Sequence, residues 1–389
     1  MTLKNLISPL RLGHSPFTLK HRIVMAPMTR IRANEDTFAP TPIMAEYYEQ
    51  RASEGGLIIT EATHISIEAT PMWHIYPTVR QFGGQVPGIW TSEQMLKWRD
   101  VTKAVHLKGA VISCQLLHTG RIAQPDVALH PLGIDATELP PVSSSATPIP
   151  FSDDVNDQYA WDKPSVLPRP LRTEEIPRLL DDYAKAAESA LNAGFDLIEI
   201  HAAHGYLIDQ FLNDGVNKRD DMYGGCVHNR CRLLFELIEH LEKVAGAGNI
   251  AVRLSPTSME SDQRYFGVED SDPVTLYSYA VEKLKNLAYL LLTEPRVGGL
   301  TDVKEKDLLN RTYRSIYDGT LIGAGGFTPE SAENAIKDGS YDAIAFGRAF
   351  ISNPNLVDKI KQDNGKNLTP WVRKHFYGGR GRVGYVDYV

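Results

Sequence analysis

Eight short apolar runs recur along the chain, and the segments between them include stretches in which apolar residues follow helical spacing. Because the apolar positions are consecutive rather than alternating, each run is typical of a parallel strand that is covered on both faces. The runs are RIVMAP (22–27), LIITEA (57–62), AVISCQLL (110–117), FDLIEI (195–200), IAVRLS (250–255), AYLLLT (288–293), TLIGAG (320–325) and YDAIAFG (341–347). Eight strand–helix units in order predict an α/β fold, a (β/α)8 TIM barrel.

Helix boundaries are predicted from capping residues. The clearest helix is expected to begin with Thr173 as its N-cap and to end at the Asn-Ala-Gly sequence 192–194, where Gly194 suits a left-handed cap. Two further helix starts are expected, at Thr91 with Gln94 three positions on, and at Thr328 followed by Pro329.

The chain of 389 residues is longer than a barrel needs, since a typical one takes about 250 residues. We therefore expect one domain, residues 1–389, with long insertions at about 63–90 and 120–172. The second insertion is rich in Pro, Ser and Asp and follows the third strand. Loops of such length usually serve as lids or rims of a site.

Charge and cysteine content narrow the class of protein. The net charge is −7 and the sequence pI is about 6.0, which disfavours nucleic acid or an anionic membrane as a partner. The three cysteines form no CxxC pair, and the N-terminus shows no secretory apolar region. The longest apolar run, LAYLLL (287–292), is too short to span a bilayer. We expect a cytoplasmic protein, whose oligomeric state the sequence does not indicate.

Candidate chemistry is sought where the strands end, because TIM barrels place their sites at the C-terminal ends of the strands. The residues at these ends are Pro27, Met28 and Thr29 (first strand), Glu61 and Ala62 (second), Gln115 and His118 (third), His201 and His204 (fourth), Arg253 (fifth), and Glu294 and Arg296 (sixth).

Glycines mark the last two strand ends. The sequence GAGGF at 323–327, which contains Gly325 and Gly326, runs into the helix start at Thr328, and Gly347 and Arg348 follow the eighth strand. Exposed amides, a helix N-terminus and a guanidinium group are typical of a phosphate site, and barrels often bind phosphate at these two strands. The simpler alternative is a helix-start turn that needs glycine for a positive φ.

Three interpretations fit His201 and His204. A metal site would be expected to add carboxylates or a third histidine, whereas the neighbouring strand ends carry Thr29, Gln115 and Arg253. The two histidines could also be satisfied core residues. The favoured interpretation is a pair of N–H donors that bind and polarise an oxygen of a ligand, with Tyr206 nearby to deliver a proton.

Thr29, Gln115 and Arg253 suit a planar heteroaromatic ring. A hydroxyl and an amide match the edge of a pyrimidine, and a fixed positive charge stabilises an anion that forms upon reduction. Each residue alone is equally compatible with packing or solvation. Together with the phosphate site they suggest flavin mononucleotide (FMN).

These motifs resemble the Old Yellow Enzyme family of FMN-dependent ene-reductases, nearly from end to end. Thr29 and the closing GYVDYV are similar to the classical branch of that family. The motifs that carry the resemblance are HRIVMAPMTR, YYEQRASEGGLIITEAT, PGIWTSEQMLKWRDVTKAVH, QLLHTGR, GFDLIEIHAAHGYLIDQFLNDGVNKRDDMYGG, EPRVGG, GRAFISNPNL and GYVDYV.

The resemblance implies a role for each matching residue. Its implied flavin contacts are Pro27, Met28, Thr29, Ala62, Gln115 and Arg253, with Gly325, Gly326, Gly347 and Arg348 at the phosphate. Its implied substrate contacts are His201 and His204, which bind the activating oxygen, together with Tyr385 in the pocket and Tyr206 as the proton donor.

The chain departs from the family pattern at several positions. Leu117 stands where the family often has tryptophan, which is expected to enlarge the substrate pocket or change how a substrate lies in it. The segment 66–86 is longer than usual, so no pocket residue is assigned there. His228 replaces a usual glutamate, which we interpret as a packing change, and Val389 replaces a common proline.

The resemblance implies an enzyme that takes hydride from NADPH through FMN and reduces the activated C=C bond of an α,β-unsaturated aldehyde or ketone. A family member that performs redox-neutral isomerisation or reduces nitro compounds or nitroesters is the alternative, which Leu117 leaves open. Two other classes also stay open: a phosphate-binding isomerase or metal-dependent lyase on a similar barrel, and a flavin-binding protein without turnover. The natural substrate and the preference for NADPH over NADH are not indicated.

Overall fold

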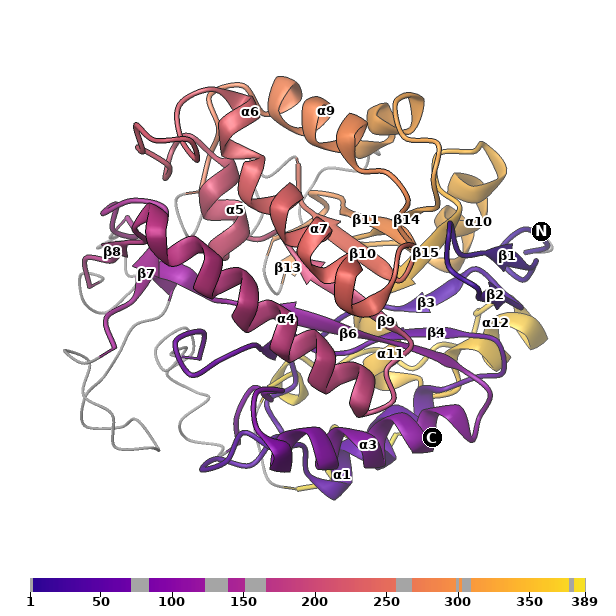
Figure 1. The fold of residues 1–389 in the computed structure, drawn as a ribbon. Helices are drawn as coiled ribbons and strands as arrows, with labels where there is room; N and C mark the ends of the chain where they lie inside the picture. Colours follow the sequence, from indigo (N-terminus) through magenta and orange to yellow (C-terminus); the bar gives the residue numbers. More distant parts are fainter. Residues whose placement is uncertain are drawn as a thin grey trace.

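A computed structural model describes residues 3–70, 84–122, 139–150, 166–256, 268–298, 301–302, 309–377 and 381–388. All eight predicted strands are present and pair in parallel, each with the next along the chain, and β15 pairs with β3 to close the barrel (Figure 1). The barrel strands are β3 (Ile23–Met25), β4 (Leu57–Ile59), β6 (Val111–Leu117), β9 (Leu197–His201), β10 (Ile250–Leu254), β11 (Tyr289–Thr293), β14 (Leu321–Ala324) and β15 (Ala343–Phe346).

Helices surround the barrel (Figure 1). They are α1 (Pro42–Arg51), α3 (Ser92–His106), α4 (Ile176–Asn192), α5 (Leu207–Leu212), α6 (Val227–Arg230), α7 (Arg232–Ala245), α9 (Pro273–Lys283), α10 (Pro329–Lys337), α11 (Arg348–Ser352) and α12 (Leu356–Asp363). The 3-10 turns are η1 (Gly120–Ile122), η3 (Thr173–Glu175), η4 (Leu309–Ser315) and η5 (Arg373–His375).

Short strands lie outside the barrel wall. They are β1 (Leu10–Arg11), β2 (Thr18–Leu19), β5 (Thr63–His64), β7 (Val142–Ser143), β8 (Arg169–Pro170), β12 (Val297–Gly298) and β13 (Thr301–Asp302). The β1–β2 hairpin buries Leu12 and Leu19 in the same apolar cluster as Val24 and Leu57 of the barrel interior. The hairpin thus covers the N-terminal ends of the strands and leaves the other end of the barrel for a site.

The capping predictions can be compared with the helix ends. Thr91 and Thr328 cap α3 and α10 as predicted, and Gly194 follows α4 with φ +92°. The prediction for Thr173 is wrong, because this residue begins the 3-10 turn η3 instead of capping a helix. Arg172 is the N-cap of this turn, and its backbone N–H donates to the Glu175 carboxylate at 2.8 Å. The Thr173 hydroxyl donates to Asp221.

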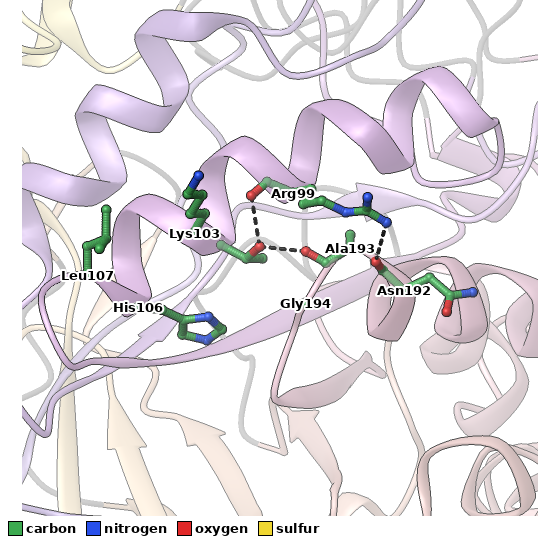
Figure 2. A pocket seen from close by; sticks show the side chains of 8 residues that line it. Arg99, Lys103, His106, Leu107, Asn192, Ala193 and Gly194 are labelled. Atoms are coloured by element: carbon green, nitrogen blue, oxygen red, sulfur yellow. Dashed lines mark hydrogen bonds between the residues drawn. The ribbon is translucent and has the colours of Figure 1, made fainter.

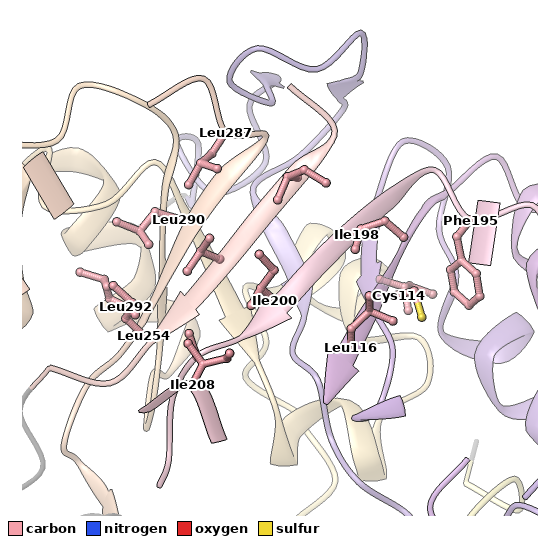
Figure 3. Close-up of a cluster of buried hydrophobic side chains, with 14 of the residues drawn as sticks. Cys114, Leu116, Phe195, Ile198, Ile200, Ile208, Leu254, Leu287, Leu290 and Leu292 are labelled. Carbon is pink, nitrogen blue, oxygen red and sulfur yellow. The ribbon is translucent and has the colours of Figure 1, made fainter. Parts of the chain in front are cut away.

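Strand side chains alternate between two buried clusters. One lies between the strands and the helices and includes Cys114, Leu116, Ile198 and Ile200 (Figure 3). The other fills the barrel interior with the alternate residues, such as Leu197, Ala251, Leu291 and Ile322. Cys114 therefore faces the helices, and burial raises the pKa of its thiol to about 12. Gln115, His201 and Arg253 occupy interior positions near the C-terminal ends of β6, β9 and β10.

The two predicted insertions lie partly outside the described residues, which omit 71–83, 123–138 and 151–165. This includes most of the 66–86 segment, and Val389 also lies outside. Within the part of the chain that is described, no helix is long and apolar enough to cross a membrane.

Candidate active site

The end of β9 brings His201, His204 and Tyr206 together. The His201 ring centroid lies 5.4 Å from that of His204 and 4.8 Å from that of Tyr206, with the rings nearly perpendicular in both pairs. His201 is buried, whereas His204 and Tyr206 are partly exposed. The three side chains predicted to bind and protonate a ligand thus form one cluster.

The backbone after β9 is held in an unusual turn. His204 has φ +57° and Gly205 has φ +78°, so two successive residues are left-handed. The His204 N–H donates to Ser255 Oγ at 2.9 Å, and the Gly205 N–H donates to Asp209 Oδ2 at 2.8 Å. The turn carries the chain into α5 and places Tyr206 at the N-cap of that helix.

Hydrogen bonding also indicates the tautomer of His201. Its Nδ1 accepts the backbone N–H of Ala203 at 3.3 Å, which leaves Nε2 to carry the proton of the neutral ring. Burial, assisted by the charge of Arg253, holds the pKa of His201 well below its usual value, and the same causes lower the pKa of His204. Both imidazoles are therefore neutral near pH 7, and each can donate one N–H group.

A metal site is not supported at this cluster. Across the described residues, no group of three or more His, Cys, Asp or Glu side chains is arranged to hold a metal ion. Arg253 is the register partner of His201 on β10, so a guanidinium group stands where a cation would have to be bound. The arrangement favours the donor pair over the metal interpretation.

Gln115, Arg253 and Glu199 line the barrel interior beside the histidines. Gln115 is the register partner of Glu199, and its Nε2 donates to Glu199 Oε1 at 2.6 Å. Arg253 Nε donates to Thr293 Oγ1 at 3.2 Å. Glu199 was not predicted as a site residue. The signal that could have identified it is a carboxylate at an interior position of an apolar strand.

Leu117 is the last residue of β6 and is buried. It alternates with Gln115 and so belongs to the interior side of the strand, two residues nearer the barrel mouth. Its register partner is His64 of β5. The position is compatible with a substrate-pocket role, which stays a prediction.

The segment after β3 carries Pro27, Met28 and Thr29, all partly exposed at the barrel mouth. The next two residues are fixed by Glu61, because the backbone N–H groups of Arg30 and Ile31 both donate to Glu61 Oε2, at 3.0 and 3.3 Å. Ile31 adopts φ +58°, which is rare for a β-branched residue.

Ala62 lies beside this segment at the end of the second barrel strand and is 6% exposed. The buried Glu61 carboxylate next to it accepts the two amides described above and therefore fixes the path of the segment predicted to contact the flavin. Like Glu199, Glu61 received no role in the sequence analysis beyond its place at a strand end.

Tyr385 lies near the C-terminal end of the chain and packs against Tyr47 and two arginines. Its side chain is fully buried and its ring stacks on Tyr47, with centroids 4.2 Å apart. The guanidinium groups of Arg30 and Arg32 lie 5.1 and 4.7 Å from the Tyr385 ring centroid. Arg30 also donates to the backbone oxygens of His375, Phe376 and Gly384. Tyr385 thus packs beside the residues that hold the C-terminal segment, and its role in the substrate pocket stays a prediction.

The predicted phosphate residues meet on adjacent strands. β14 and β15 pair in parallel, so their C-terminal ends lie side by side. Gly325 and Gly326 follow the end of β14, next to Gly347 and Arg348, which follow the end of β15. Gly325 and Gly326 have φ +98° and +65°. A Cβ atom on Gly325 would lie 2.6 Å from the backbone oxygen of Glu294, which only glycine avoids.

Side chains and helix starts complete this end of the barrel. Arg348 is the first residue of α11, and its guanidinium lies 4.8 Å from the centroid of the Trp371 ring. Arg296 Nη2 donates to the Gly325 oxygen at 2.6 Å and so holds the glycine loop. Backbone amides, a helix start and a guanidinium group therefore lie together, an arrangement that suits an anion.

A separate groove lies where α3 and α4 end, beside the N-terminal ends of their following strands (Figure 2). Arg99, Lys103, His106 and Leu107 line one side, and the groove has a volume of about 470 Å³. The Arg99 guanidinium donates to the backbone oxygen of Asn192 at 3.0 Å and so binds a carbonyl group at the C-terminal end of α4. The groove is remote from every predicted site residue.

Comparisons with known proteins agree with this geometry. A sequence model for the NADH:flavin oxidoreductase / NADH oxidase family matches residues 5–367. The chain belongs to this family. The Old Yellow Enzyme resemblance is confirmed as well, and the chain is an FMN-dependent oxidoreductase with the predicted barrel fold.

The similar proteins span nearly the whole chain. 12-oxophytodienoate reductase 7 of Oryza sativa is 40% identical and covers 96% of this chain and 91% of its own. Flavin oxidoreductase hxnT of Emericella nidulans is 39% identical over 99% and 97%. The Old Yellow Enzyme homologue of Zymomonas mobilis has a TM-score of 0.83 at 40% identity and covers 99% of each chain. Morphinone reductase in complex with tetrahydroNAD has a TM-score of 0.81 at 35% identity, covering 99% and 97%.

The residues present fit FMN. The glycine loop and Arg348 offer an anion site at the ends of β14 and β15. Gln115 and Arg253 offer an amide and a positive charge at the interior ends of β6 and β10, between which the histidines of β9 stand. A phosphate at one side of the mouth and a polar ring at the other match the donors that the chain supplies.

Proposed function

We propose that the protein is an NADPH-dependent ene-reductase that reduces the activated C=C bond of α,β-unsaturated aldehydes and ketones. The cluster of His201, His204 and Tyr206 carries the proposal, because two neutral N–H donors and a phenol stand together at the end of one strand. FMN, when bound, accepts hydride from the nicotinamide and donates it to the substrate. The chain supplies positioning and proton transfer.

The two histidines would bind the carbonyl oxygen of the substrate. His201 presents Nε2–H, since its Nδ1 accepts from Ala203. Two donors that converge on one oxygen stabilise the negative charge that develops there when the conjugated bond accepts hydride. Because burial and Arg253 keep both rings neutral, they polarise the oxygen without protonating it.

Tyr206 would protonate the α-carbon. Its ring lies 4.8 Å from that of His201, so a substrate oxygen held by the histidines brings the adjacent carbons within its reach. Its backbone position at the N-cap of α5 is fixed by the left-handed turn at His204 and Gly205. A phenol held in this way is a suitable general acid.

The names of the similar proteins support this reaction class. Two of them are named as reductases of 12-oxophytodienoate and of morphinone, and the second was solved with tetrahydroNAD. The flavin sites proposed for this chain are Pro27, Met28, Thr29, Ala62, Gln115, Arg253, Gly325, Gly326, Gly347 and Arg348. NADPH rather than NADH is the proposed hydride donor.

The test is a visible spectrum of the purified protein, recorded before and after anaerobic addition of NADPH and then of cyclohexenone. We expect flavin absorbance that bleaches with NADPH and returns with the enone, with one saturated ketone formed per NADPH consumed. Bleaching without reoxidation by any enone would contradict the ene-reductase proposal. Product that forms without NADPH consumption would instead identify the isomerase alternative that Leu117 leaves open.

A further inference from the structure

Glu199 is a buried carboxylate that the proposed reaction does not use. It lies in β9, two residues before His201, and it faces the barrel interior with no exposed surface. Its register partners are Gln115 on β6 and Ala251 on β10. A carboxylate in such a place requires compensating contacts, because burying a charged group without partners is costly.

Glu199 contacts Gln115 directly, and the Tyr289 phenol lies within hydrogen-bonding reach of the same carboxyl group. The Gln115 side-chain nitrogen donates to Glu199 Oε1 at 2.6 Å, and the Gln115 backbone N–H donates to Thr60 Oγ1 at 3.2 Å. A side-chain amide has two orientations of similar shape that exchange its donor and acceptor. Because Glu199 Oε1 accepts from the Gln115 nitrogen, it holds that nitrogen toward itself and determines which amide edge meets a ligand.

The second partner is Arg253. Both side chains lie on the interior side of adjacent strands, since Arg253 is two residues beyond Ala251, the register partner of Glu199. Burial raises the pKa of Glu199 and the Arg253 charge opposes that rise, so Arg253 favours the ionised carboxylate. The same guanidinium group lowers the pKa values of His201 and His204. Arg253 therefore acts on the whole interior end of these strands, and a negative charge at Glu199 reduces the net positive charge there.

We propose that Glu199 is a positioning residue of the flavin site, which orients the amide of Gln115 and balances the charge of Arg253. The inference rests on the proposed placement of the flavin ring at Gln115 and Arg253. Glu199 then determines how tightly oxidised FMN binds relative to reduced FMN. The reduced cofactor carries the additional negative charge, so a nearby carboxylate disfavours it.

Glu199→Gln isolates the charge, because a glutamine can still accept from Gln115. We expect the ratio of the dissociation constants of reduced to oxidised FMN to fall about tenfold, which equals a rise of about 30 mV in the two-electron midpoint potential. The potential is measured by anaerobic titration against a redox dye, and the affinity of oxidised FMN by fluorescence quenching with the apoprotein. An unchanged ratio would overturn the proposal.

Glu199→Leu removes both the charge and the acceptor. We expect this variant to show the same rise in potential and, in addition, about tenfold weaker binding of oxidised FMN, since the Gln115 amide is then free to flip. The matched control is Glu333→Gln. Glu333 is also buried, but it lies on α10, away from the strand ends, and accepts from the backbone of Asn5 and Leu6. Its FMN affinity and potential should equal those of the unchanged protein.

Gln115→Ala distinguishes failure of the proposed flavin placement from failure of the inference about Glu199. If Gln115→Ala leaves FMN affinity unchanged, the proposed flavin placement is wrong. If it weakens FMN binding while both Glu199 variants behave like the unchanged protein, the inference about Glu199 fails and the placement stands. Circular dichroism and thermal unfolding of each apoprotein show whether a variant has folded, and Glu199→Gln, which changes one atom type, keeps the test valid if Glu199→Leu does not fold.

Discussion

The ends of β9 and β10 and the ends of β14 and β15 belong to one barrel mouth but offer different chemistry. The first pair presents side chains, namely His201, His204 and Arg253, whose rings and charges are specific to those residue types. The second pair presents mainly backbone, because Gly325 and Gly347 carry no side chains and the proposed phosphate would meet their backbone amides. Substitutions are therefore expected to act in two ways. At the ends of β9 and β10 they remove a functional group, whereas at the ends of β14 and β15 they add atoms.

The largest effect is expected from an added methyl group at Gly325. In Gly325→Ala the new Cβ would lie 2.6 Å from the Glu294 oxygen at a φ of +98°, so the loop must move and the anion site is lost. We expect the purified variant to lack flavin absorbance and to bind added FMN too weakly to measure by fluorescence quenching.

The matched control for this change is Gly339→Ala. Gly339 also has a positive φ, +78°, but a Cβ atom there would meet nothing within 4 Å. It therefore reproduces the conformational cost, about 1–2 kcal/mol, without the collision. Equal loss of FMN in both variants would show that general destabilisation, and not the close approach at Gly325, explains the result.

The next largest effect is expected in the side-chain half. Tyr206→Phe removes the proposed general acid and keeps the ring against His201, so the rate of flavin reoxidation by an enone should fall about 10²- to 10⁴-fold. Reduction of the flavin by NADPH should stay unchanged. Stopped-flow absorbance measures the two half-reactions separately, and an unaltered reoxidation rate would refute the assigned role.

His204 allows a graded test of the donor pair. His204→Leu removes an N–H donor and is expected to lower kcat/KM for the enone about 10²-fold. His204→Asn keeps a donor and tolerates the left-handed φ of +57°, so it should retain more activity. If the two variants are equally impaired, backbone strain or ring packing matters more than the hydrogen bond.

The smallest effect concerns pH. Because burial and Arg253 hold the pKa values of His201 and His204 well below the usual value, neither ring should gain a proton between pH 8 and about 6. We expect kcat/KM for reoxidation by the enone to change less than about twofold in this window. A decline with a midpoint near 6.5 that disappears in His204→Asn would show that the ring titrates as it does in water.

The sequence was sufficient for the barrel and for placing most of the candidate residues at one end of it. Eight successive apolar runs fit strands that are buried on both faces. Because the C-terminal ends of barrel strands meet at one mouth, residues distant in sequence, such as His201 and Arg253, are expected to lie together there. Capping residues marked the starts of α3 and α10, because their hydrogen bonds are local. The prediction for Thr173 failed because the chain forms a 3-10 turn before α4, with Arg172 at its N-cap and the Arg172 backbone N–H bound by Glu175.

Other features required the tertiary structure. Glu61 and Glu199 act through partners 31 and 84 residues away in sequence, so no local pattern indicates that they hold Arg30 and Gln115. The stacking of Tyr385 on Tyr47 also joins residues far apart in the sequence, so no local pattern indicates it. The face of Cys114 likewise depended on the pleat of β6 within the closed barrel.

The sequence by itself determined the order of strands and helices, the residues at the strand ends and the family. These depend on short-range periodicity and on residue type, which the chain carries directly. The tertiary structure alone decided which buried groups neutralise or orient the site residues, because a carboxylate acts on whatever guanidinium or amide the fold places within a few ångströms of it.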